Sequence, residues 1–105
     1  MSEHFNQLTP AQAEALALLA EECGEVVQSV CKALRHGLYS FSPDDERETT
    51  NRTLIANEIV DLFAAVDILV RLRIVSLAEI EVARRAKHAR VARYLHHVEA
   101  PEATP

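Results

Sequence analysis

The sequence has no tryptophan and only two Tyr and three Phe among 105 residues. Large aromatic side chains therefore cannot fill a core, and the 49% of residues that are hydrophobic must bury surface mainly as Leu, Val, Ile and Ala. A chain of this length makes one domain, and a small domain with thin packing often needs a second subunit. We expect a single domain over 1–98, followed by a frayed tail over 99–105, that assembles into an oligomer.

Residues 1–8 contain no basic stretch followed by an apolar run, as a secretory signal would. The longest apolar segment, 59–72, carries charges that a lipid-facing helix would not tolerate. Cys23 and Cys31 are expected on one helix about 12 Å apart, at about 1.5 Å per residue, so they cannot pair with each other. These absences favour a reducing cytoplasm and argue against a membrane partner.

The net charge of −5 and the pI near 5.5 argue against nucleic acid as a default partner, because nucleic acid demands a basic surface. The charge is unevenly distributed. Seven of the eleven Lys and Arg residues lie within 71–93, and no basic residue precedes Lys32. The N-terminal two thirds of the chain therefore hold most of the acid.

Helical periodicity starts at a clear helix signal. Thr9 is expected to be the N-cap of a helix over 10–36, with Gln12 completing a capping box and Gly37 ending the helix. Gly24 interrupts this helix at a cost of about 1 kcal/mol relative to Ala. That cost suggests that another part of the structure approaches the backbone closely at this position.

The polar segment 38–50 is expected to be a connecting loop. A central helix over 51–73 follows, apolar on more than one face, with Asn51 as its expected N-cap. A second capping box begins at Ser76 and opens a last helix that reaches about His97. No strand alternation of useful length occurs. The sequence predicts an all-α bundle of long antiparallel helices.

The central helix contains an acidic pair without a local partner. Segment 55–70 includes Glu58 and Asp61 but no Lys or Arg. At a spacing of i, i+3 the two carboxylates lie on one side of the helix, one turn apart. Burying adjacent carboxylates is costly. A metal ion, or an Arg from another helix, is therefore expected beside them.

The first helix repeats this arrangement with Glu21, Glu22 and Glu25. Antiparallel packing of the two helices would bring both acidic groups together near mid-length. Converging carboxylates form an all-oxygen site, which favours Mg²⁺, Mn²⁺ or Ca²⁺ over Zn²⁺. The alternative is that the acids of the first helix simply face solvent.

An EExxE pattern at 21–25 followed by an ExxD pattern at 58–61 resembles the MazG-like family of all-α nucleotide pyrophosphohydrolases. The resemblance extends over 20–37 and 51–69, roughly half of the chain. The spacer over 26–57 is longer than is usual in the family, and its extra residues are expected to lengthen the loop. The resemblance implies a Mg²⁺ site, with Mn²⁺ as a possible substitute, whose ligands are Glu22, Glu25, Glu58 and Asp61.

The resemblance further implies cleavage of a nucleoside triphosphate into a monophosphate and pyrophosphate, by a homodimer or homotetramer. One of Glu21, Glu22 and Glu25 is expected to position or deprotonate the attacking water. The triphosphate tail also needs cations. The candidates are basic residues on the first and last helices: Lys32, Arg35, Lys87, Arg90 and Arg93.

Other readings stay open. Tyr39 and Phe41 either stack on a base or cover an edge of the core. A di-iron carboxylate bundle is disfavoured because the sequence contains no ExxH. A non-catalytic helical module that binds a nucleotide or a protein, and a relative that acts on phosphoribosyl-ATP, are both compatible with the pattern.

Overall fold

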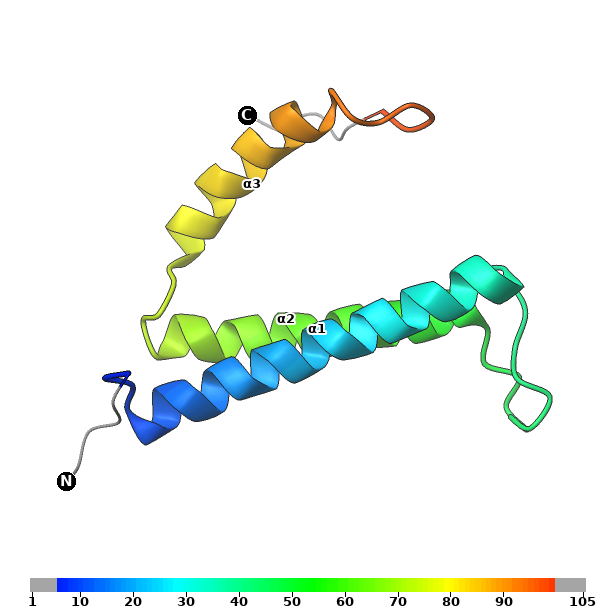
Figure 1. Cartoon of the computed structure of the whole chain (residues 1–105), viewed down its shortest axis with the longest axis horizontal. Helices are drawn as coiled ribbons and strands as arrows, with labels where there is room; N and C mark the ends of the chain where they lie inside the picture. Colours follow the sequence, from blue (N-terminus) through cyan, green and yellow to red (C-terminus); the bar gives the residue numbers. More distant parts are fainter. Residues whose placement is uncertain (1–5, 100–105) are drawn as a thin grey trace.

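The structure, a computed structural model, describes residues 6–99 and is all-helical over that range (Figure 1). Its helices are α1 (Pro10–His36), α2 (Asn51–Arg71) and α3 (Leu77–Val91). The all-α prediction is confirmed. Outside the described residues lie 1–5, where no secretory signal is expected, and 100–105, which belong to the predicted frayed tail.

Helix α1 begins and ends as predicted. The Gln12 N–H donates to Thr9 Oγ1, and the Gln12 side chain accepts from the Thr9 N–H, which completes the capping box. At the other end, Gly37 has φ 89° and donates its N–H to the Ala33 carbonyl. A side chain at this φ would strain the backbone, which explains the glycine.

Helix α2 differs from the prediction at both ends. Its N-cap is Thr50, which accepts from the Thr53 N–H, and Asn51 is the first helical residue, so the N-cap prediction for Asn51 was wrong. The helix ends at Arg71 rather than at Arg73. Arg73 adopts φ 61° and begins the turn toward α3.

The turn after α2 has the hydrogen bonds of a Schellman motif. The Arg73 N–H donates to the Val70 carbonyl, and the Ile74 N–H donates to the Leu69 carbonyl. Glycine usually occupies the left-handed position of this motif. Because Arg73 occupies the position here, no glycine marks the end of the helix in the sequence.

Helix α3 is shorter than predicted, ending at Val91 instead of about His97. Ser76 accepts from the Glu79 N–H, but no return bond to the Ser76 N–H occurs among residues 6–99, so half of the predicted capping box forms. No residue of α3 is buried. Without a packed face, α3 is stabilised mainly by the helix propensity of its residues, which is too weak to extend the helix further.

Helices α1 and α2 pack antiparallel along their lengths, whereas α3 projects away from the pair (Figure 1). The buried hydrophobic residues of the described chain are Ala15, Ala65 and Leu69. The Cα radius of gyration is 17.5 Å, against about 13 Å for a compact domain of this length. The antiparallel pair is therefore as predicted, but one chain does not close a bundle around a core.

Many large apolar side chains consequently face solvent. On α1 and α2 they are Val27, Val30, Leu34, Val60, Phe63 and Ile68. Phe63 is 63% exposed and Val60 is 64% exposed, although both lie in the middle of α2. Within the described residues, no helix is both long enough and apolar enough to cross a bilayer.

Candidate functional site

Three of the predicted acidic residues converge between α1 and α2. Carboxylate oxygens of Glu22, Glu58 and Asp61 all lie within 4.8 Å of one another. Glu22 comes from α1, while the i, i+3 spacing on α2 presents the other two on one side of that helix. Glu22 and Glu58 are half-buried and Asp61 is exposed. We call these three residues the acidic cluster.

The other two predicted acids of α1 lie outside the acidic cluster. Glu25 was expected to be a fourth metal ligand, but it is exposed and is not part of the converging group. Glu21 is exposed as well. Antiparallel packing therefore unites one carboxylate of α1 with two of α2.

No basic side chain neutralises the acidic cluster within the described chain. The ion pair found among residues 6–99 joins Arg84 and Glu81, at 2.7 Å on α3. An Arg from another helix, the alternative to a metal ion, is thus not supplied by α3 or by α1 of the same chain. The cluster concentrates negative charge without compensation.

The pKa of Glu22 reflects this crowding. Partial removal from solvent is the first cause that raises the pKa above its ordinary value, and the charge of Asp61 is the second. Glu21, Glu58 and Glu25 raise the pKa further, in that order. The charges of Glu21 and Glu25 are therefore near enough to raise the pKa of Glu22, although these two residues do not belong to the cluster.

Three carboxylates without nitrogen or sulfur ligands suit a hard divalent cation such as Mg²⁺ or Mn²⁺. The neighbouring Cys23 is free and exposed, as is Cys31, and neither belongs to the group that could hold a metal. A cation in the cluster would relieve the mutual repulsion that raises the pKa of Glu22. The residues present therefore fit the metal that the sequence pattern implies.

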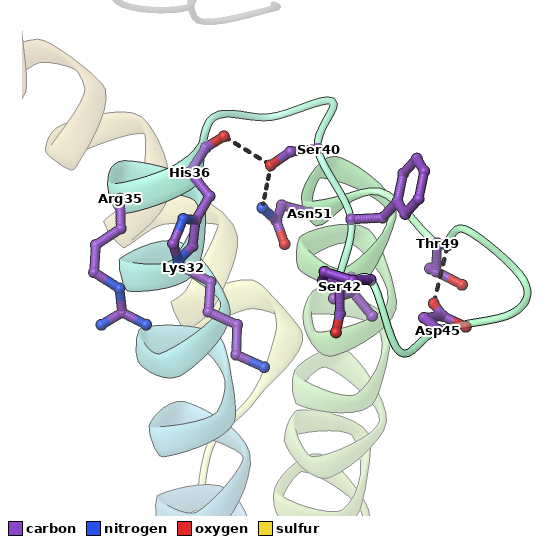
Figure 2. Close-up of a pocket in the computed structure, with 11 residues that line it drawn as sticks. Lys32, Arg35, His36, Ser40, Ser42, Asp45, Thr49 and Asn51 are labelled. Atoms are coloured by element: carbon purple, nitrogen blue, oxygen red, sulfur yellow. Dashed lines mark hydrogen bonds between the residues drawn. The ribbon is translucent and has the colours of Figure 1, made fainter.

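The basic candidates fall in two separate places. Lys32 and Arg35 line a pocket of about 430 Å³ between the end of α1, the loop and the start of α2 (Figure 2). We call it the loop pocket; its lining is Lys32, Arg35, His36, Ser40, Phe41, Ser42, Pro43, Asp45, Thr49, Asn51 and Leu54. Lys87 and Arg90 lie on α3, beside a smaller hollow of about 200 Å³.

The loop before α2 is more ordered than a connecting segment needs to be. Asn51 is buried, and its side-chain amide donates to the Gly37 carbonyl at 3.0 Å and to Ser40 Oγ at 3.2 Å. Ser40 Oγ in turn donates to the His36 carbonyl at 2.7 Å (Figure 2). Sequence reasoning missed this role because an Asn beside a helix start reads equally well as a cap.

Asp45 organises the outer part of the loop. Its carboxylate accepts from the Arg47 and Thr49 N–H groups, each at 3.0 Å. The hydrogen bond from the Thr49 backbone is the main cause that lowers the pKa of Asp45 below its ordinary value, followed by the bond from Arg47. Asp45 lines the loop pocket, but its charge is already engaged by the loop itself.

Gly24 corrects one expectation. A Cβ placed on this residue would meet nothing within 4 Å, so no other part of the described chain approaches the backbone there. The sequence had suggested a close approach.

No protein-family model matches the chain, and no curated protein or solved structure matches it. The acidic cluster and the loop pocket are therefore the features of the chain from which a function can be inferred.

Proposed function

We propose that this protein is a Mg²⁺-dependent nucleoside triphosphate pyrophosphohydrolase that converts a ribo- or deoxyribonucleoside triphosphate and water into the monophosphate and pyrophosphate. The observation that carries the proposal is the convergence of Glu22, Glu58 and Asp61 within 4.8 Å without a basic partner in the described chain. The resemblance of the two acidic motifs to the MazG-like family gives this cluster its reaction class.

Glu22, Glu58 and Asp61 would hold the metal, with Glu25 as the further ligand that the resemblance implies. Bound Mg²⁺ would neutralise triphosphate oxygens and lower the pKa of a coordinated water. Glu21 and Glu25 lie beside the cluster rather than in it. Glu21, which is not a proposed ligand, is thus free to accept a proton from the water that attacks the α-phosphorus, a role that Glu22 and Glu25 fill less readily as metal ligands.

The proposed working form is a cytoplasmic homodimer or homotetramer. The exposed apolar side chains of α1 and α2 support assembly, as does the extended shape of the single chain. Helix α3 carries Lys87 and Arg90 away from the acidic cluster of their own chain (Figure 1). These two residues would therefore reach a triphosphate most directly at the cluster of another copy.

A second candidate function is a non-catalytic helical module that binds a nucleotide or a protein. The exposed apolar surface around Val60 and Phe63 favours this candidate, because such a surface also suits a protein partner. The module would bind its partner without Mg²⁺ and form no product.

Incubation with a panel of ribo- and deoxyribonucleoside triphosphates, with and without Mg²⁺, tests the proposal. Products are separated so that monophosphate is distinguished from diphosphate, and pyrophosphate from phosphate. We expect monophosphate and pyrophosphate only when Mg²⁺ is present. If no nucleotide is turned over, the binding module becomes the better assignment.

A further inference from the structure

The loop pocket is separate from the acidic cluster. Its lining includes none of the three clustered acids. Lys32 follows Glu22 by ten residues on α1, which at about 1.5 Å per residue places it roughly 15 Å further along the helix. A ligand in the pocket would be held by a different set of side chains, and it would not need the metal.

Two charged basic side chains, Lys32 and Arg35, lie in the wall of the pocket together with the His36 imidazole, and none of the three forms an ion pair within residues 6–99. Basic residues in the last turn of a helix commonly do no more than offset the helix dipole. Here, however, the acid that lines the same pocket, Asp45, is held by the Arg47 and Thr49 amides.

Figure 2 shows the Lys32 side chain extending from α1 toward α2, with the His36 ring beside it and Arg35 pointing outward. The amide donors at the start of α2 are unavailable to an anion, because the Asn51 N–H donates to the Ser40 carbonyl and the Arg52 N–H donates to the Leu38 carbonyl. An anion would therefore be bound by the Lys32 and His36 side chains rather than by a helix N-terminus.

The pocket is also pre-formed. The buried Asn51 side chain ties the loop to both helices, and the Asp45 carboxylate fixes its outer turn. A binding site that is already ordered loses less entropy when a ligand arrives. The volume of about 430 Å³ lies within the range of about 300–1,000 Å³ that small-molecule sites occupy.

The rest of the lining is partly apolar. Phe41, Pro43 and Leu54 offer surface to a flat ring, while Ser42 and Thr49 bear hydroxyl groups. We propose that the loop pocket binds a small phosphate monoester that carries a planar ring, the chemistry of a nucleoside monophosphate, without a divalent ion. The phosphate lies against Lys32 and His36, and the ring lies against Phe41.

Calorimetric titration of the full chain in EDTA tests this site with adenosine 5′-monophosphate, ribose 5-phosphate, adenosine and inorganic phosphate. We expect the monophosphate to bind at least tenfold more tightly than any of the other three, because only it offers both the phosphate and the ring. No heat with adenosine 5′-monophosphate at millimolar concentration, or equal binding of inorganic phosphate, would overturn the proposal.

Lys32→Ala should weaken binding of adenosine 5′-monophosphate by roughly tenfold or more, as expected for loss of a charged hydrogen bond. Arg85→Ala, which removes an equal charge from an exposed position of α3, should leave that binding unchanged. Phe41→Leu should weaken the binding of adenosine 5′-monophosphate but not the binding of ribose 5-phosphate. Circular dichroism establishes that each variant is folded.

An equal loss with Arg85→Ala would show that binding depends only on net charge, and would overturn the proposal. The titration contains no Mg²⁺ and measures no turnover. Its outcome is therefore independent of whether the protein hydrolyses triphosphates.

Discussion

Glu58 is a half-buried member of the acidic cluster. It lies on a segment of α2 that contains no Lys or Arg, it is half-buried, and it contributes an oxygen to the acidic cluster. Its charge adds to the pKa shift of Glu22 on the facing helix. The two helices therefore bring like charges together at a point where solvent only partly screens them, and a cation would be the natural source of compensation.

Glu58→Gln preserves the shape of this side chain and removes its charge. We expect Mg²⁺-dependent turnover to fall by more than about 100-fold, because loss of even an outer-shell partner costs metal sites about 10–100-fold. Turnover and Mg²⁺ affinity should be measured together. Glu79→Gln, at an exposed acid of α3, is the matched control and should keep wild-type activity. Full activity in Glu58→Gln would contradict the assignment.

The lowered pKa of Asp45 allows a prediction of how the loop responds to acid. Hydrogen bonds from the Thr49 and Arg47 amides lower its pKa in the folded state. The charged carboxylate therefore stabilises the loop fully above its unfolded-state pKa, and this stabilisation is lost as the pH falls through the lowered folded-state pKa.

NMR titration of the backbone amides checks this sign. The Arg47 and Thr49 amide signals should move together at a pH below the ordinary aspartate range. In Asp45→Asn the same signals should be insensitive to pH over that interval. A midpoint at or above the ordinary pKa of aspartate would show that the two amides do not hold the carboxylate.

At the scale of elements, the three helix starts follow local chemistry, whereas only the end of α1 does. Thr9, Thr50 and Ser76 each accept a hydrogen bond from an amide of the first turn. Those starts could be predicted to within a residue. The ends of α2 and α3 depend on the left-handed Arg73 and on packing that α3 lacks, and neither leaves a reliable mark in the sequence.

The two glycines give opposite predictions for the same substitution. Gly24 lies inside α1 with open space around its Cβ direction, so Gly24→Ala should stabilise the fold by about 0.5–1 kcal/mol. Gly37 also has open space but adopts φ 89°. Gly37→Ala should therefore destabilise it by about 1–2 kcal/mol through backbone strain alone.

Urea unfolding of both variants measures these changes at equal protein concentration. If Gly24→Ala instead destabilises the protein, a neighbouring subunit or a segment outside residues 6–99 must approach α1 at Gly24. Unfolding at several protein concentrations would then separate this effect from a change within one chain.

At the scale of the whole molecule, the part of the acidic cluster that lies on one helix could be predicted from residue spacing. The Glu58 and Asp61 pair follows directly from i, i+3 geometry. The choice of Glu22 over Glu25 depends on how α1 is rotated about its axis against α2, with which it packs through buried residues such as Ala15 and Ala65. That rotation, like the burial of Asn51, arises from contacts between distant segments that periodicity cannot specify.

The exposed apolar middle of α2 predicts self-association. Phe63→Glu should shift the protein toward monomer in size-exclusion chromatography with light scattering, since a charge cannot be buried there without a partner. Tyr39→Glu changes a loop aromatic that is 74% exposed and should not alter the molar mass. A wild-type protein that is monomeric at micromolar concentration would contradict the prediction.

The projecting helix α3 also affects how readily proteases cleave an unassembled chain. Segment 82–98 contains Arg84, Arg85, Lys87, Arg90 and Arg93 and no acidic residue. It makes few contacts with the rest of the chain and buries no side chain. Trypsin-like proteases cleave after Lys and Arg where the backbone can open locally. An isolated chain should thus be cut first in α3, whereas a copy that covers this helix would protect it, so that proteolysis would selectively remove unassembled chains.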